Sequence, residues 1–296
     1  MEVTIVIPTF NGKGLIEKNL PKVTEAMGNI ANGVKEITVV DDGSKDETVE
    51  FLKKNFPQVR LIRHKRNLGF PASVNSGVKE ASTPLIALLN SDVSPSANFL
   101  ESALPHFENK KVFAVSLNEE GKSLTWTKGH FKDGFVGWEP GPKDRGVHET
   151  FWVSGGSGVF RKSIWDELGG MDEALFSPFY WEDLDICYRA AKRGYQLLWE
   201  PGAKVEHKHE STIGLLPQKY VETIRERNQL LFIWKNLTSP NLFKRHLIGL
   251  IKRCLGHPGY IRIVLAALPK LGAVLDARKR ELKEGRVSDE AIFART

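Results

Sequence analysis

The chain has 296 residues and a formal net charge of +6, and 41% of its residues are hydrophobic and 26% charged. This length suits one large α/β domain or two ordinary ones. The composition is that of a globular protein and argues against disordered, collagen-like and coiled-coil chains. The sequence has no run of about 18 uncharged apolar residues, which argues against a transmembrane protein.

The N-terminal residues and the cysteines both favour an intracellular protein. The first residues lack a basic segment, and the apolar run after them is too short for a signal peptide, so we expect no export. Cys187 and Cys254 lie far apart and fit neither a disulfide framework nor a zinc ribbon. We therefore expect a cytoplasmic location.

The positive charge is concentrated near the C-terminus. Between Leu242 and Arg286 there are eleven Lys or Arg residues and three acidic ones, a net charge of +8 that leaves −2 for the rest of the chain. Attraction to nucleic acid or to an anionic membrane is therefore a property of this segment alone. No nucleic-acid recognition motif accompanies the charge, so we expect no nucleic-acid partner.

The first ninety residues alternate apolar strands with helical segments. Strands are predicted at 3–8, 36–40, 59–63 and 85–89. Helices are predicted at 14–27, with a break near Pro21, at 44–56 and at 72–81. Continuous apolar strands separated by helices indicate a mostly parallel sheet with helices on both faces. In such a sheet the ligand binds outside the carboxyl ends of the strands, where polar clusters occur at residues 9–11, 41–42 and 90–92.

Two common nucleotide-binding signatures do not occur in the sequence. Residues 12–17, after the first strand, lack the third glycine of G-x-G-x-x-G, and no G-x-x-x-x-G-K-[ST] is present. The order H-E-x-x-H of zinc proteases is also missing. The sequence thus argues against dinucleotide-dependent hydride transfer, P-loop chemistry and zinc proteolysis.

The acidic turn after the second strand has an ordinary explanation for part of its pattern. Ser44 and Glu47 have the spacing of a capping box, with Gly43 supplying the turn. Asp41 and Asp42 are not needed for that cap, and they are either solvated turn acids or ligand-binding groups.

Asn90-Ser91-Asp92 follows the fourth strand in the same way. Its composition is that of an ordinary turn. The alternative is a metal site, because one Asp at a strand end can hold Mg²⁺ or Mn²⁺ with a substrate diphosphate.

The middle of the chain contains two denser clusters. Residues 152–161 are rich in Gly and Ser, which indicates close backbone packing or the close approach of a sugar or diphosphate. Residues 182–193 are predicted to form a helix that ends at Gly194, with acids in its first turn and bases in its last, as the helix dipole favours. Three carboxylates in four positions behind Tyr180-Trp181 exceed what capping requires, so we favour a functional site, and aromatic rings beside acids suit a sugar.

Taken together and in this order, these motifs resemble the family 2 glycosyltransferases of GT-A fold. The closest resemblance is to the rhamnosyltransferase-like branch that builds surface polysaccharides. The matching residues, between about 2 and 236, are 6–11, 39–44, 66–70, 75–77, 88–92, 155–161, 169–173, 182–185 and 227–228. One departure concerns the D-x-D motif of the family, which reads Asn90-Ser91-Asp92 and leaves Asp92 as its only charged ligand.

The resemblance implies that a sugar moves from a nucleotide-diphosphate donor, UDP- or dTDP-linked, to a glycan or lipid-linked acceptor with inversion. The residues that it places at the nucleotide sugar are Pro8, Thr9, Asn11, Asp41, Asp42, Asn67, Gly69, Asn75, Asn90, Ser91 and Asp92. It also implies a divalent cation, Mg²⁺ or Mn²⁺, on Asp92. His207 is a candidate further ligand, with His209 as a substitute; the ordinary alternative is a solvated histidine.

Two acids are assigned to catalysis by the same resemblance. Asp183 would be the general base, and Glu182 would orient the acceptor or share that role. Gly155, Gly156 and Trp181 would contact the acceptor or the sugar. The alternative function is a catalytically inactive GT-A-fold scaffold of a polysaccharide assembly. A pyrophosphorylase-type enzyme would need a Gly-rich, Arg-containing loop that residues 9–14 do not supply.

We divide the chain into a catalytic domain, 1–236, and a basic amphipathic helical region, 237–296, which Pro258 and Pro269 split into short helices. Two interpretations of that region stay open: helices packed on the catalytic domain with solvated basic faces, or a peripheral membrane contact through 242–286 at the inner face of the cell membrane. Residues 119–150 are predicted to be a variable insertion or an acceptor loop.

Overall fold

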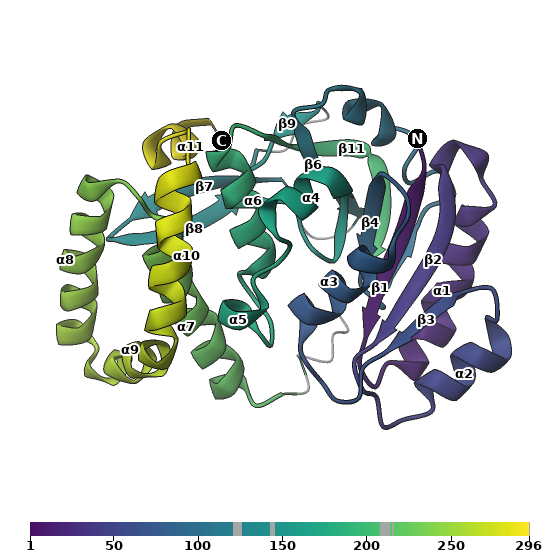
Figure 1. Cartoon of the computed structure of the whole chain (residues 1–296), viewed down its shortest axis with the longest axis horizontal. Helices are drawn as coiled ribbons and strands as arrows, with labels where there is room; N and C mark the ends of the chain where they lie inside the picture. Colours follow the sequence, from purple (N-terminus) through teal and green to yellow (C-terminus); the bar gives the residue numbers. More distant parts are fainter. Residues whose placement is uncertain (121–125, 143–145, 208–213, 215, 296) are drawn as a thin grey trace.

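A curled β-sheet with helices around it forms the body of the computed structural model, which describes residues 1–120, 126–142, 146–207, 214 and 216–295 (Figure 1). Within these residues, nine strands form one sheet in the order β3-β2-β1-β4-β10-β6-β11-β5, with β9 beside β11. Four strands from the first part of the chain are parallel: β1 (Val3–Thr9), β2 (Val34–Asp41), β3 (Arg60–Arg63) and β4 (Leu85–Leu89).

The other half of the sheet is mixed. β10 (Ser157–Arg161) is antiparallel to β4 and to β6 (Val112–Glu120), and β6 is parallel to β11 (Gln196–His207). The short strands β5 (Val93–Pro95) and β9 (His148–Glu149) pair antiparallel with β11. β11 pairs with β6 from Gln196 to Glu200 and resumes this pairing at Lys204 after an irregularity. His207 is therefore the last residue of a strand.

Helices cover both faces of the sheet, as predicted. Successive side chains of a strand point to opposite faces: Ile5 packs with Leu20 of α1 (Lys13–Met27), whereas Val6 packs with Val78 of α3 (Phe70–Glu80). On the face of α1 lie also α2 (Thr48–Asn55) and the 3₁₀ turn Leu104–Glu108; on the face of α3 lie α4 (Lys162–Leu168) and α6 (Glu182–Lys192). Shorter elements are the 3₁₀ turn Ile30–Asn32 and α5 (Glu173–Phe176).

Two local predictions are wrong. α1 continues through Pro21, because the buried neighbours Leu20 and Val23 hold the helix on the sheet despite the missing N–H of proline. The capping box is not formed, because the Oγ of Ser44 accepts a hydrogen bond from the N–H of Asn11, at 2.8 Å, and α2 begins only at Thr48. Gly43 does supply the turn, with φ of 76°.

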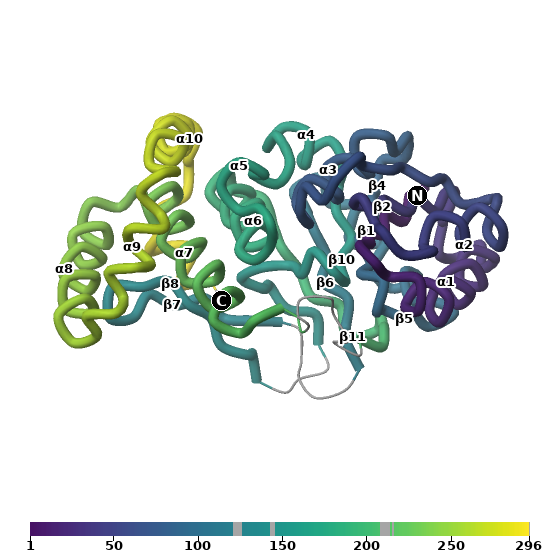
Figure 2. The backbone as a smooth tube through the Cα atoms, turned by 90° about the horizontal axis from the view of Figure 1, so that it is seen from below, coloured from purple at the N-terminus to yellow at the C-terminus, as the bar shows by residue number. Residues whose placement is uncertain are grey.

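The segment 119–150 contains a hairpin of β7 (Thr127–Lys132) and β8 (Phe135–Pro140), which reaches away from the main sheet towards the C-terminal helices (Figures 1 and 2). Its tip lies against α8 (Pro240–Gly256): a Cβ atom added to Gly134 would lie 2.9 Å from the carbonyl oxygen of Arg245. The hairpin therefore connects the region of the main sheet with the C-terminal helices.

The helices α7 to α11, residues 218–295, form what we call the C-terminal layer, beside the sheet in Figure 2. Besides α8 they are α7 (Gln218–Asn236), α9 (Ile261–Ala267), α10 (Leu271–Glu284) and α11 (Asp289–Arg295). Short 3₁₀ turns, Pro258–Tyr260 and Leu268–Lys270, separate α8, α9 and α10, as the two prolines predict. α7 packs on α6, α9 and α10 pack on α7, and Leu242, Ile263 and Val274 belong to the apolar cluster that these helices share. Among the described residues, no helix is long and apolar enough to cross a membrane.

Candidate active site

The carboxyl ends of β1, β2 and β4 open into a cleft of about 330 Å³, which we call the strand-end cleft. The residues that line it are Pro8, Thr9, Phe10, Leu15, Asp42, Asn67, Gly69, Phe70, Ser73, Asn90, Ser91, Asp92, Pro178, Phe179, Leu216 and Tyr220. Eight of the eleven residues predicted for the nucleotide sugar are in this set. The polar loops that are separated by up to eighty residues in the sequence thus meet around one cavity, as expected for a parallel sheet.

The other three predicted nucleotide residues lie beside the cleft and fasten its loops. Asn11, with φ of 49°, accepts a hydrogen bond from the N–H of Lys45. Asp41 is buried and accepts from the N–H of Ser44 with one oxygen, while its other oxygen has no partner among the described residues. Asn75 donates to the carbonyl oxygen of Met171, at 2.8 Å.

Asp42 both lines the cleft and organises its wall. Its Oδ1 accepts from the N–H of Leu68 at 2.9 Å and contacts Nδ1 of His64 at 2.8 Å, and its Oδ2 accepts from the N–H of Gly69 at 2.8 Å. Gly69 has φ of 96°, and a Cβ atom there would lie 2.8 Å from the backbone of Pro178. The glycine is therefore required for the loop to close against this carboxylate.

The predicted metal ligands Asp92 and His207 lie together. Residue 93 of β5 is the antiparallel partner of His207 at the end of β11, which brings Oδ1 of Asp92 to 3.2 Å from Nε2 of the imidazole. Nδ1 of His207 contacts Oε1 of Glu119 at 2.9 Å, and Ser157 donates to that same oxygen at 2.6 Å. Such a carboxylate behind a histidine fixes the ring and its tautomer in metal sites.

The chemistry of this pair fits a divalent cation. Oδ2 of Asp92 is buried and has no hydrogen-bond partner in the described part of the chain. Burial alone would lower the pKa of His207, but the bonds to Asp92 and Glu119 raise it to about 9, so positive charge is favoured where a cation would lie. No three His, Cys, Asp or Glu side chains of the described residues converge on one metal position, so substrate and water would complete the shell. His209 lies outside the described residues.

The predicted base Asp183 lies in the first turn of α6. Its Oδ2 accepts from the N–H of Gly155 at 3.2 Å, and its Oδ1 accepts from the N–H of Leu184 at 2.8 Å. Burial raises the pKa of Asp183 to about 6, although these two N–H groups oppose the rise. Burial and the charge of Asp183 raise the pKa of the neighbouring Glu182 well above its usual value. The pair therefore favours a proton on Glu182 and the negative charge on Asp183.

A short chain of contacts connects this base to the metal motif. Gly155 binds Asp183, and the carbonyl oxygen of the next residue, Gly156, accepts from the N–H of Asn90 at 2.9 Å. A Cβ atom on Gly156 would lie 2.4 Å from the side chain of Asn90, so close packing explains this glycine. The Gly-rich segment thereby connects Asp183 with the loop that carries Asp92.

The turn before α6 is held in an uncommon conformation. Tyr180 and Trp181 have φ of 72° and 77°, in the left-handed region that costs non-glycine residues about 1–3 kcal/mol each. Nδ2 of Asn228 on α7 bonds the carbonyl oxygens of Phe176, Phe179 and Tyr180 and holds the turn. Strain held in this way fixes the direction in which Trp181 and the two acids point.

The structure adds one aromatic residue, Trp138, that the sequence analysis missed. Trp138 of the hairpin lies edge-to-face with Trp181, with ring centroids 5.4 Å apart, and with Trp152, at 5.7 Å. Trp138 is 40% exposed. Its place in the segment 119–150 gave no signal of this role. Glu119 was missed for the same reason.

The third acid of the cluster, Asp185, has a structural role. It is fully buried and its Oδ2 contacts Arg189 at 2.8 Å and Lys235 at 2.9 Å. Burial alone would raise the pKa of Asp185, but the two cations hold it below its usual value. This part of the acidic excess at 182–185 therefore belongs to the core.

Comparison with known proteins gives the family. Residues 4–169, more than half of the chain, match the family described as glycosyl transferase family 2. The chain belongs to glycosyl transferase family 2. This confirms the resemblance drawn from the motifs.

Among relatives, the chain is 29% identical over 221 residues to the pre-mycofactocin glycosyltransferase of Mycobacterium tuberculosis, which covers 72% of this chain and 44% of that protein. It is 25% identical over 243 residues to the O-antigen chain rhamnosyltransferase RfbN of Salmonella typhimurium, which covers 75% and 71% of the two chains. The chain thus spans less than half of the length of the first relative.

Solved structures show the same fold. GalNAc-T7, solved with UDP, GalNAc and Mn²⁺, aligns with a TM-score of 0.63 at 15% identity, over 88% of this chain and 57% of that one. The mannosyltransferase PcManGT of Pyrobaculum calidifontis, solved with GDP-Man and Mn²⁺, aligns with a TM-score of 0.55 at 16% identity, over 95% and 87%. The predicted GT-A fold is thereby confirmed.

Proposed function

We propose that this protein is an inverting glycosyltransferase that moves a sugar from a nucleotide-diphosphate donor, UDP- or dTDP-linked, to a glycan or lipid-linked acceptor. One observation carries the proposal: contacts run from the half-buried carboxylate of Asp183 through Gly155 and Gly156 to Asn90, which lines the strand-end cleft two residues before Asp92. A base next to a diphosphate-binding position is the arrangement that direct sugar transfer requires.

The nucleoside of the donor would lie against Pro8, Thr9 and Asp42. The hydroxyl of Thr9 is buried without a partner among the described residues, and a donor hydroxyl or base could supply one. Oδ2 of Asp42 accepts a single N–H, from Gly69, and keeps a lone pair for the base or ribose. Asn67 and Ser91 would line the path of the diphosphate.

The diphosphate would lie near Asp92 and His207. These two side chains would hold a divalent cation, Mg²⁺ or Mn²⁺, and Mn²⁺ in two solved structures of the same fold supports this assignment. When bound, the cation supplies Lewis-acid stabilisation of the leaving diphosphate. Glu119 keeps the histidine ring oriented towards that position.

Asp183 would accept the proton of the acceptor hydroxyl. As that oxygen forms its bond to the anomeric carbon, the bond from carbon to diphosphate oxygen breaks on the opposite face, and the anomeric configuration inverts in one displacement. Glu182, whose pKa is raised well above its usual value by burial and by Asp183, would donate its proton in a hydrogen bond that orients the acceptor. Trp181 and Trp138 would pack on the apolar face of the acceptor sugar.

The division into a catalytic domain, 1–236, and a helical region, 237–296, is part of the proposal, as is action in the cytoplasm at the inner face of the membrane. A lipid-linked acceptor would be reached most directly from that face.

Inversion is tested by following slow hydrolysis of the donor by proton NMR. The proposal predicts that an α-linked donor sugar is released first as the β-anomer and then mutarotates. Release of the α-anomer would contradict a single displacement.

A further inference from the structure

The C-terminal layer exposes a concentrated set of aliphatic side chains. Of the seventeen large apolar side chains that are exposed in the described residues, nine lie between residues 240 and 275. They are Leu247, Ile248, Ile251, Leu255, Ile261, Leu265, Leu268, Leu271 and Leu275. Exposed aliphatic residues are ordinary when scattered, but a concentration of them marks an interaction surface.

α8 separates these residues from its packing face. Leu242, His246 and Gly249 are buried against the protein, and Nδ1 of His246 contacts the carbonyl oxygen of Gly134 at 2.7 Å. On the outer side, side chains four residues apart form a stripe. It consists of Leu247, Ile251 and Leu255, which are 46%, 61% and 77% exposed. α8 therefore has an apolar face towards solvent as well as one towards the protein.

The same region carries only positive charge. Residues 240–275 include six Lys or Arg residues and no Asp or Glu. Two of the guanidinium groups lie over rings: Arg245 over Phe131 at 5.2 Å and Arg253 over Phe135 at 3.8 Å. Arg245 is exposed, and Arg253 is half-buried and also lies over the ring of Tyr260 at 5.1 Å.

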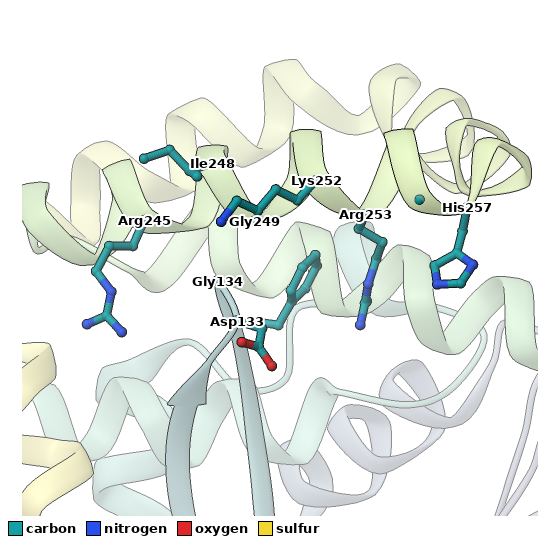
Figure 3. Close-up of a pocket in the computed structure, with 10 residues that line it drawn as sticks. Asp133, Gly134, Arg245, Ile248, Gly249, Lys252, Arg253 and His257 are labelled. Atoms are coloured by element: carbon teal, nitrogen blue, oxygen red, sulfur yellow. The ribbon is translucent and has the colours of Figure 1, made fainter.

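A groove of about 560 Å³ runs between α8 and the tip of the hairpin (Figure 3). The groove is lined along its length by basic residues of α8, Arg245, Lys252 and Arg253, and by His257 just after the helix. Asp133 is the one acidic residue among the described residues that line it. A groove with this excess of cations beside an aliphatic stripe fits a phosphate that is attached to an apolar chain.

We propose that α8 docks on the surface of an anionic phospholipid bilayer, with Leu247, Ile251 and Leu255 in the interface and a lipid phosphate in the groove between Arg245 and Lys252. Interfacial helices bind through this combination of buried apolar area and attraction to anionic lipid. Arginine and lysine are both effective phosphate partners. A second copy of the chain fits less well, because a two-fold interface would set this positive surface against itself.

α7 connects this surface with the strand-end cleft. Tyr220 lines the cleft, whereas Lys219 and Glu222, in the same turn, line a second groove with Arg253 and Arg262. The bilayer and the cleft would therefore lie on two sides of one helix. The delivery of a lipid-linked acceptor from the bilayer to the cleft rests on the proposed function; the docking itself does not.

Vesicle flotation of the full chain without donor tests the docking. We expect the protein to float with vesicles of phosphatidylglycerol and phosphatidylcholine and to stay behind with phosphatidylcholine alone. Each basic side chain near an anionic surface contributes about five-fold in affinity, so Arg245→Gln with Lys252→Gln should weaken binding about 25-fold. Ile251→Ser with Leu255→Ser should remove detectable flotation.

Matched control variants test whether flotation depends on these particular residues of α8 and not on the total charge or the exposed apolar area of the protein. Lys53→Gln with Lys54→Gln, exposed on α2, removes the same charge, and Ile30→Ser with Leu282→Ser removes aliphatic groups that are 94% and 56% exposed. Both should bind vesicles with an affinity within two-fold of that of the unchanged protein.

Docking is overturned if the unchanged protein does not float, or if either α8 pair behaves like its control. It is also overturned if light scattering shows a dimer that Ile251→Ser with Leu255→Ser converts to monomer. Donor binding, measured separately, stays unaffected in all four variants.

Discussion

The strand-end region and the C-terminal layer both bury carboxylates, but the two regions differ in the partners that those carboxylates have. In and around the C-terminal layer, Asp185 pairs with Lys235, Glu281 with Arg193 and Asp289 with Lys192, each within 2.9 Å. In the described residues, the buried carboxylates with an oxygen that has no hydrogen-bond partner are Asp41, Asp92 and Glu182. All three were predicted as site residues from the sequence.

The difference indicates two uses of buried charge. A fully paired carboxylate specifies one packing of the helices around it, and its removal leaves a cation without a partner. Burying a carboxylate oxygen without a hydrogen-bond partner costs free energy, and a ligand that bonds this oxygen can relieve that cost. The buried acids of one chain can therefore be sorted into structural and functional ones by their partners.

The largest expected effect is on catalysis at Asp183. Asp183→Asn should lower the turnover number about 10²–10⁴-fold, because the acceptor hydroxyl loses its base. Donor binding, measured by calorimetry, should be unchanged, since this side chain bonds Gly155 and Leu184 and no residue that lines the strand-end cleft. A smaller loss, together with a larger one in Glu182→Gln, would make Glu182 the base.

The pH profile sharpens the same assignment. Because the pKa of Asp183 is raised to about 6, the base is protonated at acid pH and ionised above that value. The rate should rise about ten-fold per pH unit below pH 6 and level off above it. A profile that stays flat between pH 5 and 7, with donor binding held constant, would contradict a base of this kind.

The comparison itself is tested by stability. Asp185→Asn leaves the charges of Lys235 and Arg189 with a neutral partner and should lower the free energy of unfolding by about 3–5 kcal/mol. Glu182→Gln replaces a carboxyl group that favours its proton and has no cationic partner among the described residues, and should change that free energy by less than about 1 kcal/mol. Urea unfolding monitored by tryptophan fluorescence measures both. Equal losses would remove the distinction between the two groups of acids.

A smaller effect is expected at Glu119, behind the proposed metal site. Glu119→Gln keeps the shape of the side chain but weakens its bond to Nδ1 of His207, and should lower the affinity for Mn²⁺ about 10–100-fold. Titration of Mn²⁺ followed by electron paramagnetic resonance, in the presence of the nucleotide diphosphate, measures this directly. Glu120→Gln, on the exposed neighbour, is the control. An affinity equal to that of the control would assign Glu119 to structure alone.

The smallest expected effect is at the exposed indole. Trp138→Ala should raise the KM for the acceptor about 2- to 10-fold with little change in the turnover number, because ring contacts of this kind contribute about 0.5–1.5 kcal/mol. A change in the KM for the donor instead would place this ring at the other substrate.

The four parallel strands of the first ninety residues and most of the lining of the cleft were predictable, because both depend on short apolar runs and on the polar residues that follow them. The roles that depend on distant pairing were not. Asp183 and Asp185 look alike in sequence, and the buried pairing of Asp185 with Arg189 and with Lys235, fifty residues away, makes the second one structural. Glu119 reaches His207 only because β6 pairs with β11, and Ser44 accepts a hydrogen bond from the N–H of Asn11, in the loop after β1, instead of capping α2.

The two faces of α8 were beyond the sequence for a related reason. Its apolar residues occur almost all around the helix, so the pattern does not tell which of them pack on the protein. Gly134 and Gly249, at a close approach of hairpin and helix, decide that orientation. The two interpretations of this region, packed helices and a membrane contact, therefore apply to different faces of α8. The inner face packs on the protein, and the outer face is the proposed membrane contact.

The central claim is most directly tested by binding and hydrolysis of a panel of UDP-, dTDP- and GDP-sugars, with Mn²⁺ or Mg²⁺ and then with EDTA. The account predicts that one donor class binds in a metal-dependent manner and is slowly hydrolysed, and that Asp92→Asn abolishes the metal dependence. Absence of binding of any nucleotide sugar under all these conditions would contradict it and would favour an inactive scaffold.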